Sequence, residues 1–271
     1  MTVDAHHHLW DPATRDHPWM VDALRHRFRP DDLRAVTAAA GIDRTVLVQT
    51  VSDPAETAEL LATAAASDGL IAGVVGWADH TRPVPGQVDG LAHRDLLVGV
   101  RHQAEDEPDP GWPARPEVVA GVRSAAEAGL VVDLLVRTDQ LPAAVRLVDA
   151  VPGASFVLDH GAKPPLGTDA YPAWRAGVAE LAARPHVAGK LSGLFTLARQ
   201  DLLGPAVEHL LAVFGPQRLI FGTDWPVSTL AGDHACVVER TRAFLDPLPD
   251  GERAAVLGGN AVRTYHLPEP S

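Results

Sequence analysis

Short runs rich in β-branched and other apolar residues alternate with longer, alanine- and leucine-rich segments along the whole chain. Eight of these runs have the composition of strands, at residues 3–9, 45–49, 71–77, 97–102, 131–136, 155–160, 187–192 and 219–222. Several are almost uniformly apolar, which is typical of parallel strands covered on both faces. Eight such strands with helices between them predict one domain, a (β/α)8 barrel over residues 1–271. An open doubly wound sheet would normally place a glycine-rich turn after its first strand, where this chain has His6-His7-His8.

The segments between the strands carry the marks of helix ends. Asp53 stands directly before Pro54, an arrangement that caps a helix and fills its first position. Another helix begins at Pro30 and ends at Gly41, where glycine suits the left-handed cap. Further helices are expected at residues 116–128, 141–151, 171–183, 201–214 and 233–245, with weak helical character at 81–92.

Composition and charge narrow the functional classes. The 271 residues include 35 acidic and 23 basic side chains, and the net charge of −12 argues against nucleic acid as the main partner. The single cysteine, Cys236, cannot form an internal disulfide, and no apolar run approaches the ~20 residues that cross a bilayer. No cationic leader precedes an apolar stretch at the N-terminus, so we expect a cytoplasmic protein with a small-molecule partner and no membrane partner. Whether it forms a homo-oligomer is left open.

Polar and aromatic side chains stand at or near the ends of the predicted strands. In (β/α)8 barrels the reactive groups lie at the C-terminal strand ends. The side chains in such positions are His6, His8, Gln49, Trp77, Asp79, Arg101, His102, Asp133, Asp159, His160, Lys190, Ser192, Thr223 and Asp224. A purely structural barrel does not need such a ring, which therefore predicts a polar site at one end.

His6, His8 and Asp224 form the sharpest group. Residues two apart on a strand point the same way with Cα atoms ~6.6 Å apart, so both imidazoles can reach one ion, while His7 points toward the helices. In a closed barrel the eighth strand lies beside the first, which brings Asp224 within reach of both. Two histidines and a carboxylate are typical of catalytic zinc, and the carboxylate without metal suits a general base. A histidine-tag remnant and a turn or capping aspartate are the alternatives that stay open.

Five further residues are candidates for catalysis or substrate contact. His160 suits a metal, a carbonyl or a water, and Arg101 suits a carboxylate or a polarised carbonyl oxygen. We expect these two to act with Asp224 in catalysis, and Trp77, His102 and Lys190 to contact the substrate. A hydrogen-bonded loop histidine and aromatic side chains that cover the barrel are the plainer alternatives.

An ordered set of segments spans the chain, from Asp-Ala-His-His-His-Leu-Trp-Asp at 4–11 to Gly-Asn-Ala at 259–261. Between them lie 76–79, 99–103, 106–108, 158–164, 190–194 and 221–226. With these segments the chain resembles the amidohydrolase superfamily, and within it the sugar-lactonase branch related to L-fuconolactonase, L-rhamnonolactonase and 2-pyrone-4,6-dicarboxylate lactonase. The resemblance implies a barrel hydrolase whose reaction centre is lined by His6, His8, His160 and Asp224.

Two departures from the superfamily pattern bear on the metal. Arg101 and His102 stand where many members have a carbamylated lysine or a glutamate that bridges two metals. Residues 133–138 contain no histidine, where many mononuclear members have one. The resemblance therefore implies at most one divalent ion, zinc before others, on His6, His8 and Asp224, and it leaves metal-free catalysis open.

We expect hydrolysis of a small lactone, of a sugar acid by the resemblance. Asp224 would take a proton from water and return it to the leaving alkoxide, while a divalent ion, or His160, Arg101 and Lys190, stabilises the oxyanion. Two alternatives stay open. One is a metal-dependent decarboxylase of an aromatic acid, against which the missing histidine counts; the other is a catalytically idle barrel that serves in binding.

Overall fold

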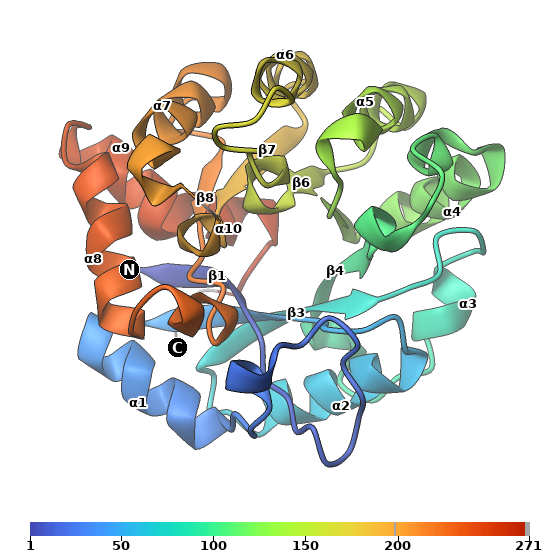
Figure 1. Ribbon diagram of the computed structural model, residues 1–271. Helices are drawn as coiled ribbons and strands as arrows, with labels where there is room; N and C mark the ends of the chain where they lie inside the picture. The colour runs from blue at the N-terminus through green and yellow to red at the C-terminus, as the bar shows by residue number, and fades with distance from the viewer. Residues whose placement is uncertain (198, 269–271) are drawn as a thin grey trace.

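The strands form one parallel sheet in which each strand pairs with the next along the chain, and the helices surround it (Figure 1). The computed structural model describes residues 1–197 and 199–268. The strands are β1 (Val3–His7), β2 (Arg44–Val48), β3 (Ile71–Trp77), β4 (Leu97–His102), β5 (Val131–Leu134), β6 (Phe156–Leu158), β7 (Val187–Leu191) and β8 (Leu219–Phe221). The predicted (β/α)8 architecture is confirmed.

The last strand returns to the first and closes the barrel. His7 forms a parallel bridge with Trp225, and the backbone N–H of His8 donates a hydrogen bond to Trp225 O at 2.7 Å. The N–H of Asp224 donates to His6 O, also at 2.7 Å. These bonds tie together the C-terminal ends of β1 and β8, as the closure of a barrel requires.

The helices up to residue 245 follow the strands at the expected places, and those after it were not predicted from the sequence. The helices are α1 (Pro30–Ala40), α2 (Pro54–Ala65), α3 (Pro85–Val88), α4 (Pro116–Glu127), α5 (Leu141–Ala150), α6 (Tyr171–Ala182), α7 (Leu203–Phe214), α8 (His234–Leu245), α9 (Asp250–Ala254) and α10 (Asn260–Thr264). The Asp53 carboxylate caps α2 by accepting a hydrogen bond from Ala55 N, and Gly41 ends α1 with a φ of 64°. Within residues 1–197 and 199–268, no helix has the length and apolar character of a membrane span. The cytoplasmic setting stays a prediction.

Several strands end earlier than the sequence indicated. The run 3–9 ends at His7, and the run 131–136 ends at Leu134. The largest consequence falls on 155–160, because β6 ends at Leu158 and a 3₁₀ turn, Asp159–Ala162, follows it. Within that turn His160 has a φ of 54°, which lies outside the β region, so the backbone leaves the sheet there.

The barrel interior changes from apolar to polar along its axis. One end is filled by small aliphatic side chains from the strands, and Ala261 and Tyr265 from the C-terminal region pack against them. The other end holds buried charged side chains, among them Asp159, Lys190 and Asp224. A larger apolar cluster joins the strands to the surrounding helices. The scaffold is therefore a packed core with one polar end.

Candidate active site

Three side chains from the two strands that close the barrel meet at its polar end. The Asp224 carboxylate, which follows β8, has Oδ1 3.4 Å from His8 Nε2 and 3.8 Å from His6 Nε2. The rings of His6 and His8 lie 5.0 Å apart between centroids. His7 points elsewhere, with its Nε2 2.9 Å from Thr45 Oγ1. The structure thus brings together the two histidines that the strand spacing paired and the aspartate that barrel closure was expected to add.

The local backbone holds Asp224 in place. Its φ is 59°, so the chain leaves the strand direction at this residue and turns the carboxylate toward β1. Just before it, the N–H of Thr223 donates to Asp4 Oδ1 at 2.8 Å. Gly222 provides the space, because a Cβ there would lie 2.7 Å from His6 Cβ. The position of Asp224 therefore depends on β1 as much as on β8, which it follows.

Burial and neighbouring charges set the protonation of this group. Burial would raise the pKa of the Asp224 carboxyl, but His160 and His8 outweigh it, and the pKa lies below its usual value. Burial lowers the pKa of His6 well below its usual value although Asp159 opposes it, and burial also lowers the pKa of His160. At neutral pH the Asp224 carboxyl group is therefore ionised, and the ring of His6 is neutral.

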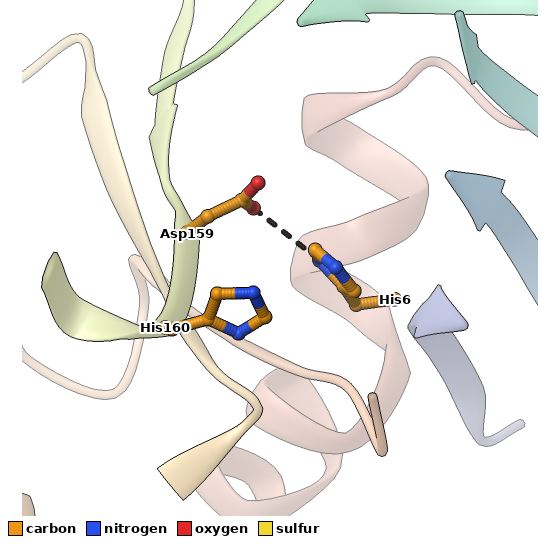
Figure 2. A group of neighbouring side chains, drawn as sticks. All are labelled: His6, Asp159 and His160. Carbon is orange, nitrogen blue, oxygen red and sulfur yellow. Dashed lines mark ion pairs between the residues drawn. The ribbon is translucent and has the colours of Figure 1, made fainter. Parts of the chain in front are cut away.

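A network of buried charges lies beneath these residues. We call it the floor cluster and define it as His6, Asp133, Asp159 and Lys190, each at most 1% exposed. Lys190 Nζ lies 2.5 Å from Asp133 Oδ2, 3.0 Å from Asp159 Oδ1 and 3.2 Å from His6 Nδ1. Figure 2 shows Asp159 and His160 side by side on one turn, with the Asp159 carboxylate directed at the His6 ring 3.3 Å away. Tyr265, beyond α10, donates to Asp133 Oδ1 at 2.8 Å.

The two aspartates of the floor cluster differ in their pKa values. Burial raises the pKa of Asp133 to about 6, although Lys190 opposes the change. Burial acts on Asp159 in the same direction, but Lys190, His6 and Arg101 together hold its pKa well below the usual value. Asp159 is therefore a fixed negative charge 3.3 Å from His6 Nδ1, an atom that the Lys190 ammonium also contacts at 3.2 Å.

A cavity of about 360 Å³ opens above Asp224, within the size range of small-molecule sites. Its polar lining includes His8, Arg101, His160 and Asp224, and Trp19, Leu135, Leu197 and Val227 add apolar surface. Arg101 donates to Asp159 Oδ2 at 2.8 Å and to Gln49 O at 2.6 Å. His160 Nδ1 lies 2.9 Å from Ser192 Oγ. All three residues expected to act in catalysis thus line one cavity.

The three expected substrate contacts lie elsewhere. Arg101 and His102 are neighbours on β4 and point in opposite directions, so His102 stacks on Trp112, with centroids 4.3 Å apart, rather than facing the cavity. The Trp77 ring lies 6.1 Å from that of His102, in the same outer group. Lys190 is fully buried beneath His6. None of the three is among the described residues that line the cavity.

Two charged residues of the cavity were not identified as site residues from the sequence. Glu105 lies in the loop after β4 and Lys163 in the turn after β6, and Lys163 Nζ lies 2.6 Å from Glu105 Oε2. We call them the mouth pair. Lys163 belongs to the Asp-His-Gly-Ala-Lys-Pro motif and stands beside a strand end, which is a usable signal. Glu105 lies between the segments 99–103 and 106–108 but belongs to neither of them.

The donor atoms fit a single divalent ion. His6, His8 and Asp224 each offer one ligand atom, and these atoms lie within 4.8 Å of one another. His8 Nδ1 lies 2.8 Å from Val48 O, so a proton held there leaves Nε2 free to bind a metal. His6 Nε2 is buried with no hydrogen-bond partner in the described part of the chain, as expected of an atom that awaits a ligand.

The fold and the site together place the chain in a known group of enzymes. Residues 3–267 match the model of the amidohydrolase family, and the chain belongs to that family. It is 37% identical over 282 residues to an L-fucono-1,5-lactonase of Burkholderia ambifaria, with 99% of this chain and 97% of the relative covered. An L-fucono-1,5-lactonase of Burkholderia multivorans is 36% identical, with 100% and 98% covered. The resemblance to the sugar-lactonase branch is therefore confirmed.

A solved structure extends this similarity to the fold. An amidohydrolase from Burkholderia multivorans, determined with bound zinc, superimposes with a TM-score of 0.92. The two sequences are 35% identical, and the match covers 99% of this chain and 100% of the other. The likeness therefore includes the strand ends that carry the site.

Proposed function

We propose that this chain hydrolyses the lactone of a sugar acid, with L-fucono-1,5-lactone as the first candidate substrate. The observation that carries the proposal is the Asp224 carboxylate, 3.4 Å from His8 Nε2, in a cavity that also contains Arg101 and His160. The full-length identity of 37% to an L-fucono-1,5-lactonase supports this reaction and this substrate class.

In the proposed mechanism Asp224 acts as general base and then as general acid. Its lowered pKa keeps the carboxylate ionised at neutral pH, so it takes a proton from the water that attacks the lactone carbonyl. Negative charge then develops on the carbonyl oxygen, where Arg101 and His160 stabilise it. When the ring C–O bond breaks, Asp224 returns the proton to the leaving alkoxide and the open hydroxy acid forms.

His6, His8 and Asp224 would hold one divalent ion, and zinc is the ion that two histidines and a carboxylate favour. When bound, it supplies positive charge that polarises the carbonyl. We expect the purified protein to bind one equivalent of zinc and the His8→Ala variant to lose it, as measured by equilibrium dialysis with elemental analysis. Equal zinc binding by both proteins would contradict this ligand set.

A pH-indicator assay over a panel of sugar-acid lactones and aromatic lactones tests the reaction, with a buffer blank for spontaneous opening and with chelator in a parallel series. We expect the largest kcat/KM for L-fucono-1,5-lactone or a close stereoisomer. No turnover above the blank for any lactone would refute the proposal, and release of CO₂ from an aromatic acid would favour a decarboxylase instead.

The Asp224→Asn variant tests the assigned base. It keeps the size of the side chain but removes its ability to take a proton, so kcat should fall by about 10³-fold or more. Circular dichroism and the thermal midpoint should show an intact fold. Parental turnover by this variant would remove Asp224 from the mechanism.

A further inference from the structure

An ion pair stands at the opening of the cavity, between two loops that are far apart in sequence. Lys163 Nζ contacts both carboxylate oxygens of Glu105, at 2.8 and 2.6 Å. The two side chains are 41% and 20% exposed, so the pair faces solvent as well as the cavity. A partly exposed ion pair contributes little to stability. The position of the pair therefore points to a role in selecting which molecules enter the cavity.

The loop that carries Glu105 is anchored to the neighbouring β5 side of the barrel. The N–H of Glu105 donates to Leu135 O at 2.9 Å, and Arg137 donates through its guanidinium to Glu105 O. Gln140 Nε2 donates to the adjacent Ala104 O at 2.6 Å. The Glu105 carboxylate therefore extends from a fixed point of the backbone.

Lys163 is fixed in the turn that carries His160. Its φ is 48°, and its N–H donates to His160 O at 2.9 Å. Trp174 Nε1 of α6 donates to Gly161 O at 2.8 Å and holds the middle of the turn. The ammonium group and the imidazole are thus presented to the cavity by one short backbone unit.

The cations along the cavity wall are already neutralised. Among the lining residues in the described ranges, Arg101 and Lys163 are the cationic ones, and they pair with Asp159 and Glu105. A substrate carboxylate at the mouth would find Lys163 already paired and would meet the negative charge of Glu105. Hydroxyl groups meet no such obstacle, because they can donate to Glu105 and accept from Lys163.

We propose that the mouth pair makes this site selective for uncharged, hydroxyl-rich lactones over lactones that carry a free carboxylate. The inference rests on the proposed lactonase function and specifies its substrate class. Glu105 and Lys163 are specificity-determining residues in this view, and the proton transfers stay with Asp224.

The test compares L-fucono-1,5-lactone, which is neutral, with D-glucaro-1,4-lactone, which carries a carboxylate. Glu105→Gln keeps the side-chain size and frees Lys163, so the ratio of kcat/KM for the acidic to the neutral lactone should rise about tenfold or more. The change should lie mainly in KM and should shrink at about 0.5 M salt, because partly exposed charges are screened. Lys163→Met should lower the same ratio.

Asp109→Asn is the matched control, since Asp109 lies in the same loop, pairs with Arg115 and is absent from the cavity lining. It makes the same charge change and should leave the ratio unaltered. An unaltered ratio in Glu105→Gln, or a parent enzyme that prefers the acidic lactone, would overturn the inference.

Calorimetry repeats the comparison without turnover. It measures the binding of an uncharged sugar lactam and of a lactam that carries a carboxylate. Preference of the parent for the uncharged lactam, relaxed in Glu105→Gln, supports the inference even if neither lactone is hydrolysed. Failure of hydrolysis alone would therefore refute the proposed function and not the selectivity.

Discussion

The chain has two lysines, and their surroundings are opposite. Lys190 of β7 is fully buried in the floor cluster, 2.5 and 3.0 Å from two carboxylates. Lys163 stands in the turn after β6, where its side chain is 41% exposed and faces the carboxylate of Glu105. The lysine of the strand thus holds buried carboxylates together beneath the site, while the lysine of the turn stands where a substrate enters the cavity.

The largest expected effect tests whether burial makes Lys190 contribute more to stability than Lys163. In Lys190→Met the carboxylates of Asp133 and Asp159 stay buried without their shared cation, and removing one partner of a buried pair costs about 3–5 kcal/mol. In Lys163→Met only a partly exposed pair is lost, at less than about 1 kcal/mol. Urea denaturation at neutral pH measures both free energies of unfolding. Equal losses in the two variants would show that depth in the barrel is not what distinguishes them.

The second prediction concerns the space around His160 and Asp224, the two groups that Gly193 touches. Gly193 has a φ of 64°, and a Cβ there would lie 2.5 Å from His160 Nδ1 and 3.0 Å from Asp224 Oδ2. Gly193→Ala should displace both groups and lower kcat/KM by about 100-fold.

Gly41 provides the control for backbone strain, because it also has a φ of 64° but no atom within 4 Å of a Cβ. Gly41→Ala should cost about 1 kcal/mol of stability and leave kcat/KM as in the parent. If the two variants lose activity alike, the effect belongs to left-handed backbone strain and not to the crowding of His160 and Asp224.

The contrast between strand and loop positions also explains what could be predicted from the sequence. Strand periodicity and barrel closure follow from local pattern and a general rule of topology, so the grouping of His6, His8 and Asp224 was accessible. Residue alternation along β4 was accessible too, and it already separates Arg101 from His102. The expectation that Arg101 and His102 would both reach the substrate overlooked this alternation.

The depth of a side chain along the barrel axis and the path of the loops could not be predicted from the sequence. Lys190 and Asp133 lie within their strands, but only the assembled barrel shows that they meet below His6 and bind each other. The 3₁₀ turn after β6 depends on positive φ values at successive residues, including a histidine and a lysine, for which sequence propensity gives little indication. The pairing of Glu105 with Lys163 joins residues 58 positions apart through two such loops.

The smallest expected effect concerns the far side of the floor cluster. Tyr265 donates to Asp133 and so connects the C-terminal region to Lys190 and, through it, to His6. Tyr265→Phe removes one hydrogen bond while Lys190 still compensates Asp133, so stability should fall by about 1–2 kcal/mol. Because Lys190 and Asp159 continue to hold His6, kcat/KM should stay within about twofold of the parent. A tenfold loss of kcat/KM with unchanged KM would contradict this expectation. It would mean that the orientation of His6 depends on every contact from Lys190 through Asp133 to Tyr265, so that the floor cluster and the C-terminal region act as one unit.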